Sequence, residues 1–140
     1  MKSFATTIVI RASAGSVWDI LTDLPAWPSW NTTVDRVEGR VALGETVRVW
    51  VKLSPGRAFP VKVKELTAPS RMVWGSGMPL GLFKGERVYT LTPLPDGAVE
   101  FSMREAFTGP LSGLIGKSIP DMQPAFEEFA ACLKAKAEAP

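Results

Sequence analysis

The sequence predicts an α+β fold in which a curved antiparallel sheet wraps around a long C-terminal helix. Three observations predict it: a strand and a helix at the N-terminus, a series of alternating apolar segments through the middle, and a helical apolar stripe at the end. With 140 residues, the chain has the usual length of one domain. We therefore expect residues 1–140 to form a single domain.

The N-terminal part begins with a strand and a helix. Residues 3–11 alternate between apolar and polar side chains, as a half-buried strand does. A helix should follow, because Ser13 can cap its N-terminus and apolar residues recur at helical spacing until Pro25 ends it. The next segment, PAWPSWN, is too rich in proline for a regular element, so we expect Trp27 and Trp30 on an irregular corner.

The middle of the chain is predicted to form a meander of about six antiparallel strands. Apolar residues from Val47 to Leu53 occupy every second position, which indicates a half-buried strand. Trp50 shares the other face with Arg48 and Lys52, so we expect it on the outer surface, at a possible homodimer contact. The remaining strands are expected at residues 33–40, 59–64, 72–74, 83–93 and 98–108.

A long amphipathic helix closes the chain. Its apolar stripe consists of Met122, Phe126, Phe129, Ala130, Leu133 and Ala137. Pro124 either lies near the start of this helix or kinks a helix that begins before Pro120. The preceding GPLSGLIGK segment is expected to form a short separate helical turn. The last helix should lie across the concave face of the curled sheet and leave a space between the two.

Composition excludes several kinds of function. Histidine is absent, which removes Ser-His-Asp and Cys-His catalysis and two-histidine metal motifs. Cys132 is the single cysteine, and we interpret it as core filler. The 16 basic and 14 acidic residues nearly cancel without long runs, so nucleic acid is not an expected partner. We expect no metal or other cofactor, no membrane insertion and a cytoplasmic location, because the N-terminal apolar stretch is too short for a signal or a span.

The stretch WGSGMPLGLFKGER, residues 74–87, has the glycine content of a phosphate-binding loop but not its spacing. Lys84 is followed by Gly85 and Glu86 instead of Ser or Thr, and the segment after Gly85 has the pattern of a strand instead of a helix. A phosphate site is therefore not predicted here.

Several segments along the chain resemble one known family. The segments are IRASAGSVWDILTD after the first strand, Trp30-Asn31, LGETVRV near residue 43, LTP at 91–93, EAFTG at 105–109 and LK at 133–134. Together they resemble the START-related helix-grip superfamily (SRPBCC), and within it the polyketide cyclase/dehydrase and lipid-transport-like group. The resemblance spans nearly the whole chain and implies a helix-grip fold with a deep, mostly apolar cavity for a small hydrophobic molecule.

The resemblance places the glycine stretch near the mouth of that cavity. Met78, Leu80, Leu82 and Phe83 stand among its glycines, so the stretch has the composition of a mobile apolar lid. The alternative is a hairpin whose apolar residues cover the edge of the core.

One pair of residues is a candidate for chemistry. If Pro93 faces Val99 in the last hairpin, then Tyr89 faces Met103, and Arg87 faces Glu105 on the same face. Arg87, Glu105 and Tyr89 could anchor a ligand oxygen or stabilise an enolate, and are the catalytic candidates. The alternative is an ion pair at the rim that only satisfies itself.

The wider ligand-binding set consists of apolar residues around this pair, which could equally form a filled core. It comprises Trp30, Phe59, Trp74, Met78, Phe83, Arg87, Tyr89, Met103, Glu105, Phe107, Ile119, Met122 and Phe126.

Three functions follow as hypotheses: binding or transport of a small hydrophobic, lipid-like or aromatic molecule; a cyclase/dehydratase-like enzyme; and a co-chaperone-like protein-interaction module. Whether the protein is an enzyme is left open by these residues.

Overall fold

The computed structural model describes residues 2–139, which form a seven-stranded antiparallel sheet around a C-terminal helix. The strand order is β1-β7-β6-β5-β4-β3-β2. Strands β2 to β7 therefore form a meander, and the N-terminal strand β1 pairs with β7 at one edge of the sheet. The strands are β1 (Lys2–Ile10), β2 (Val34–Glu38), β3 (Thr46–Val51), β4 (Ala58–Thr67), β5 (Arg71–Gly77), β6 (Lys84–Pro93) and β7 (Val99–Thr108).

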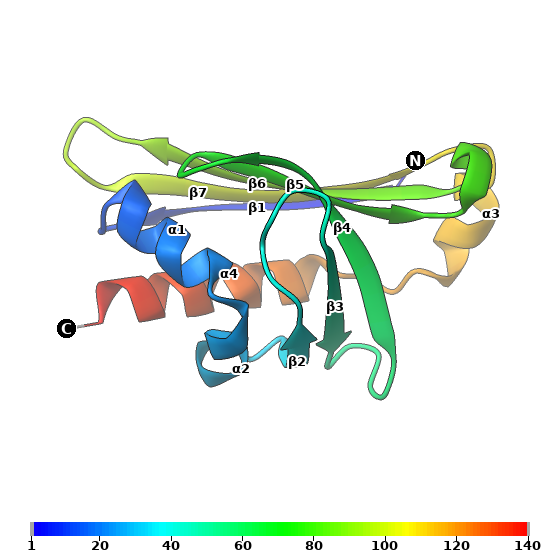
Figure 1. The fold of residues 1–140 in the computed structure, drawn as a ribbon, viewed down its shortest axis with the longest axis horizontal. Helices are drawn as coiled ribbons and strands as arrows, with labels where there is room; N and C mark the ends of the chain where they lie inside the picture. Colours follow the sequence, from blue (N-terminus) through cyan, green and yellow to red (C-terminus); the bar gives the residue numbers. More distant parts are fainter. Residues whose placement is uncertain (1, 140) are drawn as a thin grey trace.

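The sheet curls around helix α4 (Gln123–Glu138). In Figure 1, α4 runs along the long strands β1, β6 and β7, while β4 bends away from them and carries β3 and β2 to the side of the helix. Phe126, Phe129, Ala130 and Leu133 of α4 are at most 2% exposed, so the predicted stripe faces the sheet. The predicted α+β class, with a curved sheet wrapped around the last helix, is confirmed.

The helices begin where the sequence indicates a start. The hydroxyl of Ser13 accepts a hydrogen bond of 3.1 Å from the backbone N–H of Ser16 and caps α1 (Ala14–Thr22). Pro124 is the second residue of α4, where its missing N–H costs nothing, so the helix is not kinked by it. The predicted separate turn before α4 is present as α3 (Ser112–Ile115) and the 3-10 turn η3 (Gly116–Ser118).

The expectation of an irregular corner at PAWPSWN is wrong. The segment forms a 3-10 turn, η1 (Leu24–Ala26), followed by one helical turn, α2 (Trp27–Trp30). Each proline lies at the start of its turn, where a helix has no partner for an N–H group. Trp27 and Trp30 therefore stand at helical spacing, and both point into the core.

The core is an aromatic cluster centred on Trp27. Its ring stacks on Trp74 at 5.7 Å and meets the edge of Phe129 at 5.3 Å. Its indole N–H donates 3.0 Å to the carbonyl of Leu21, so this buried donor is satisfied. Tyr89 packs on Trp74 with ring centroids 5.1 Å apart. The aromatic residues thus fill the part of the interior between the sheet and the middle of α4.

Two smaller predictions are also wrong. Leu53 lies beyond the end of β3, in the turn to β4, and its side chain is 45% exposed. Cys132 is half-buried, and its Sγ lies 3.2 Å from Oγ1 of Thr32 at the edge of the core, so it does not fill the interior.

The glycine stretch is mostly strand. Gly77 belongs to β5 and Gly85 to β6, so only residues 78–83 connect the two strands. A Cβ on Gly77 would lie 2.3 Å from the carbonyl oxygen of Phe83, and a Cβ on Gly85 would lie 3.0 Å from the ring of Phe107. Close packing, not mobility, requires glycine at these two positions.

We expect Gly77→Ala to lower the free energy of unfolding by about 1–3 kcal/mol, because the new methyl group must displace backbone atoms of the hairpin. Urea unfolding followed by tryptophan fluorescence measures the change. Gly113→Ala is the matched control, since no heavy atom lies within 4 Å of its added Cβ, and its stability should stay the same or rise slightly. Equal stability of the two variants would contradict the packing role of Gly77.

Candidate functional site

An ion pair on the inner face of the sheet forms the centre of the candidate site. The register of β6 and β7 pairs Pro93 with Val99 and Arg87 with Glu105, as the sequence predicts. Nε of Arg87 donates a hydrogen bond of 2.8 Å to Oε1 of Glu105. Their side chains are 21% and 14% exposed, less than those of any other ion pair between described residues. The pair is therefore shielded from bulk water without being sealed off.

Helix α4 holds the guanidinium from the other side. Its Cζ lies 4.8 Å from the centre of the Phe126 ring, a cation–π contact. Burial by itself lowers the pKa of Arg87, but the charge of Glu105, the contact with Tyr89 and the hydrogen bond to Glu105 outweigh it and raise this pKa. Arg87 is thus a permanent cation fixed between a carboxylate and an aromatic ring.

Two buried donors lie beside Arg87 without a hydrogen-bond partner among the described residues. They are the indole N–H of Trp74, which is the cross-strand neighbour of Arg87, and the hydroxyl of Tyr89, two residues along the same strand. A buried donor without a partner costs about 1–3 kcal/mol. Such donors are satisfied when an oxygen acceptor is supplied, by water or by a ligand.

The predicted ligand-binding residues divide into two sets. Trp74, Tyr89, Met103 and Phe126 are at most 3% exposed and belong to the packed aromatic core. A second set is half-buried toward the end of the sheet where β6 begins. We call it the rim, and it consists of Phe59, Phe83, Phe107, Ile119 and Met122. The structure thus offers accessible apolar surface at this end, whereas Trp74, Tyr89, Met103 and Phe126 form a closed floor.

The loop expected to act as a lid is attached at the rim. Phe83 stacks on Phe107 with ring centroids 5.7 Å apart, and the N–H of Leu111 donates 2.9 Å to the carbonyl of Leu82. Met78 is 43% and Leu80 is 96% exposed, so neither side chain covers the ion pair. Lid closure therefore stays a prediction. Trp30 lies away from this end, at the edge of the Trp27 cluster.

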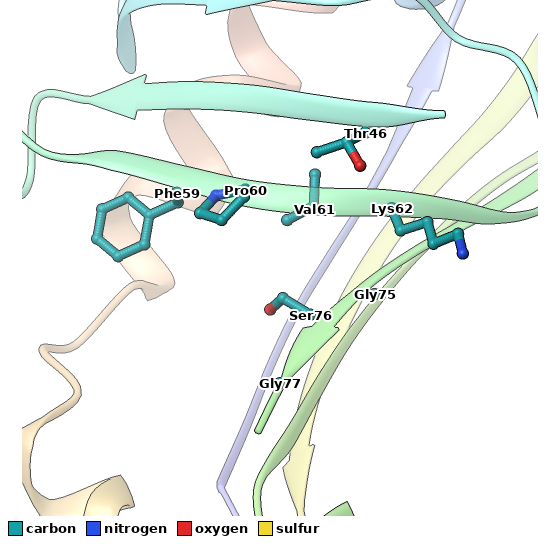
Figure 2. Close-up of a pocket in the computed structure, with 8 residues that line it drawn as sticks. All are labelled: Thr46, Phe59, Pro60, Val61, Lys62, Gly75, Ser76 and Gly77. Atoms are coloured by element: carbon teal, nitrogen blue, oxygen red, sulfur yellow. The ribbon is translucent and has the colours of Figure 1, made fainter. Parts of the chain in front are cut away.

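A pocket of about 370 Å³ opens where β4 and β5 separate. The pairing of these strands stops at Lys62 and Gly75, beyond a register shift, so their ends diverge into a wedge. Figure 2 shows Phe59 and Ser76 directed to the same side of this wedge. Of the predicted ligand-binding residues, Phe59 lines it, and the other lining residues are Thr46, Pro60, Val61, Lys62, Gly75, Ser76 and Gly77. Ser76 is two residues from Trp74, so the pocket borders the inner face next to Arg87.

Sequence reasoning missed one basic residue at the rim. Lys2 pairs with Phe107 across β1 and β7, and its Nζ donates 2.7 Å to the carbonyl of Ile119 and 3.3 Å to that of Gly116. It thereby ties the connection before α4 to the sheet. The period-two alternation of Lys2 with Phe4 could have placed it on the inner face.

The outward position of Trp50 agrees with the sequence, although a partner within the chain covers its ring. The guanidinium of Arg36 lies 5.0 Å from the ring centre, and Trp50 is half-buried. The homodimer contact stays a prediction. Within residues 2–139 there is no group of three acidic or cysteine side chains arranged to hold a metal ion, and no helix long and apolar enough to cross a membrane.

A curled sheet closed by a long helix, with a charged pair on an otherwise apolar inner face, defines a protein of the helix-grip class. The chain belongs to the polyketide cyclase/dehydrase and lipid transport family, whose model matches residues 1–138. Membership indicates a ligand-binding or polyketide-related role and confirms the resemblance seen in the sequence.

Three proteins are similar to this chain in sequence or in fold. The chain is 25% identical over 119 residues to the oxopyrrolidines biosynthesis cluster protein O of Penicillium oxalicum, covering 64% of this chain and 59% of that protein. It therefore spans little more than half of this curated relative. A START superfamily protein from Mycobacterium smegmatis superposes with a TM-score of 0.69 at 19% identity, with 97% of each chain covered. DynU16, from the dynemicin biosynthetic locus, superposes with a TM-score of 0.72 at 15% identity, covering 99% of this chain and 48% of that one.

We expect Tyr89 to ionise only above about pH 10, the ordinary value for tyrosine, because burial raises its pKa and the charge of Arg87 opposes this only in part. Tyr89 is the single tyrosine, so phenolate absorbance reports on it alone. The unfolded chain releases the proton first, and the free energy of unfolding should therefore fall above about pH 10 more steeply than in Tyr89→Phe. Ionisation at the same pH in folded and denatured protein would show that this hydroxyl reaches water.

Proposed function

We propose that the protein binds a small hydrophobic molecule that carries an oxygen acceptor, such as a carboxylate, phenol or carbonyl. The oxygen is bound by Arg87, and the apolar body lies against the rim. One observation carries the proposal: a partly exposed ion pair stands among apolar side chains on the inner face of the sheet, and Glu105 accepts from only one N–H group of Arg87. Ligand sites in proteins have this composition, with mostly apolar walls and a few placed polar groups.

Arg87 has donors to spare for such a ligand. Its Nε is used by Glu105, while the two terminal nitrogens carry four further N–H groups in a planar fork. A fork of this kind binds carboxylate and carbonyl oxygens with defined geometry. Glu105 and Phe126 fix its orientation before the ligand arrives, which reduces the entropy lost on binding.

The size and position of the wedge pocket support the same location. Its volume of about 370 Å³ lies within the range of small-molecule sites, and its Phe59 and Val61 walls are apolar. The family description names both polyketide chemistry and lipid transport, and two of the similar proteins are named for biosynthetic loci. Aromatic or polyketide-like acids and lipid-like acids are therefore the ligand classes we propose.

We expect Arg87→Met to weaken binding of 2-naphthoate by roughly 10- to 100-fold, because a charge-assisted hydrogen bond contributes about 1.5–3 kcal/mol. Binding of 2-methylnaphthalene, which has the same rings and no acceptor, should not change. Quenching of tryptophan fluorescence gives both dissociation constants.

Lys84→Met is the matched control for charge. Lys84 is on the same strand, but it is three residues from Arg87 and its Nζ pairs with Glu86 at 3.4 Å. This variant should bind 2-naphthoate as the wild type does. Equal affinities of Arg87→Met and wild type for 2-naphthoate would remove Arg87 from the site, and a lack of binding by either probe would overturn the proposal.

A second candidate function is cyclisation of a polyketone chain, favoured by the carboxylate next to the cation. In this mechanism Arg87 polarises a ketone carbonyl, and Glu105 accepts a proton from the adjacent carbon. The resulting enolate carbon attacks a second carbonyl of the same chain, forming a carbon–carbon bond, and Glu105 returns the proton to the new alkoxide. Tyr89 can donate a hydrogen bond to either oxygen.

If this reaction occurs, Glu105→Gln should retain 2-naphthoate binding and lose cyclisation of a linear aromatic polyketone by about 100-fold or more, because the amide accepts no proton. Liquid chromatography of the cyclised product measures the rate. Glu86→Gln, which changes the same charge outside the site, should keep the wild-type rate. Equal rates with and without the wild-type protein would leave binding as the only function.

A further inference from the structure

The β3–β4 hairpin carries a concentration of positive charge, most of which lies outside the proposed ligand site. Residues 46–64 contain five basic residues and no acidic one, although the whole chain has 16 basic and 14 acidic residues. The rest of the chain is therefore net acidic. This asymmetry is large for a protein whose formal net charge is only +2.

The five cations form no ion pair and reach solvent, although the guanidinium of Arg57 also lies 5.2 Å from the centre of the Phe59 ring. They are Arg48, Lys52, Arg57, Lys62 and Lys64. All five are exposed, and no ion pair between described residues includes any of them. Glu45 and Glu65, which flank the hairpin in the chain, pair with Arg40 and Arg71. Glu38, which faces Arg48 across β2 and β3, pairs with Arg36 instead. The field of these cations is therefore not neutralised locally.

The tip of the hairpin carries an exposed leucine and projects from the body of the protein. Figure 1 shows the β3–β4 connection extending away from the long strands, beyond the bend of β4. Leu53 lies in this connection and is 45% exposed, with Lys52 and Arg57 close to it in the chain. An exposed apolar side chain surrounded by cations combines the two contacts that a phospholipid surface offers.

We propose that the β3–β4 hairpin docks the protein on the anionic surface of a phospholipid bilayer. The five cations lie against the lipid phosphates and carboxylates, and Leu53 enters the interface between head groups and acyl chains. A second copy of this chain is a poor occupant, because it would place five unpaired cations against five others. This contact is peripheral and uses neither Arg87 nor Glu105, although Lys62 also lines the wedge pocket. It therefore does not depend on the proposed ligand.

We expect the protein to sediment with phosphatidylcholine vesicles that contain about one third phosphatidylserine at about 50 mM NaCl. It should be released from them at about 500 mM NaCl. Pure phosphatidylcholine vesicles should not bind it. Each basic residue near an anionic surface contributes several-fold in affinity, so Arg48→Gln/Lys52→Gln/Lys64→Gln should weaken binding roughly 100-fold.

A matched triple variant separates local charge from net charge. Arg104→Gln/Lys117→Gln/Lys136→Gln removes three exposed cations outside the hairpin and should lower binding by less than about threefold. Leu53→Ser should weaken binding by about tenfold, and Leu43→Ser, at a leucine that is 66% exposed in another loop, should not. All variants should keep the wild-type melting temperature and 2-naphthoate affinity, which distinguishes loss of docking from loss of the fold or of the ligand site.

Three results would overturn the proposal. The first is no sedimentation with the phosphatidylserine vesicles at low salt. The second is an equal loss of binding in the two triple variants, which would reduce the effect to net charge. The third is retention on a heparin column without vesicle binding, which would assign the hairpin to an acidic polymer.

Discussion

The register of β6 against β7 is the constraint on which the site depends. It places Arg87 opposite Glu105 on the inner face, where their side chains meet at 2.8 Å. A shift of β6 by one residue would turn Arg87 to the outer face, away from Glu105, and bring polar residues of β6 into the core. Removing one partner of a pair this shielded would leave a charge near apolar surface, a loss of several kcal/mol at full burial and less at 21% and 14% exposure.

Packing decides where a ligand has room. The cluster around Trp27 fills the interior along the middle of α4, with neighbouring ring centroids 5.1–6.2 Å apart. The aromatic floor orients Arg87, because Phe126 lies under its guanidinium. Accessible apolar surface is left at the rim and in the wedge where β4 leaves β5. The cluster around Trp27 thus stabilises the fold, while the rim and the wedge provide the surface at which we propose that a ligand binds.

Much of this arrangement could be predicted from the sequence, because period-two patterns fix both the strand and the face. The assumption that Pro93 faces Val99, supported by the parity of apolar residues, paired Arg87 with Glu105, and the register confirms it. Helical spacing correctly predicted that Phe126 faces the sheet. The helical turn at Trp27 was not predicted, because a proline in the first turn of a helix cannot be distinguished in the sequence from a proline in a loop. The division between packed floor and open rim depends on side-chain packing in three dimensions, which no local pattern reports. The wedge depends on a register shift in β4 that alternation alone does not reveal.

We propose that the part of the fold around Arg87 binds a hydrophobic small molecule through an oxygen acceptor. Native mass spectrometry of freshly purified wild-type protein and of Arg87→Met tests it most directly. We expect a small-molecule adduct on the wild type that is lost or much reduced in the folded variant, and that extracts into organic solvent as an acid, phenol or ketone. An adduct retained equally by both proteins, or one that carries no oxygen function, would contradict it.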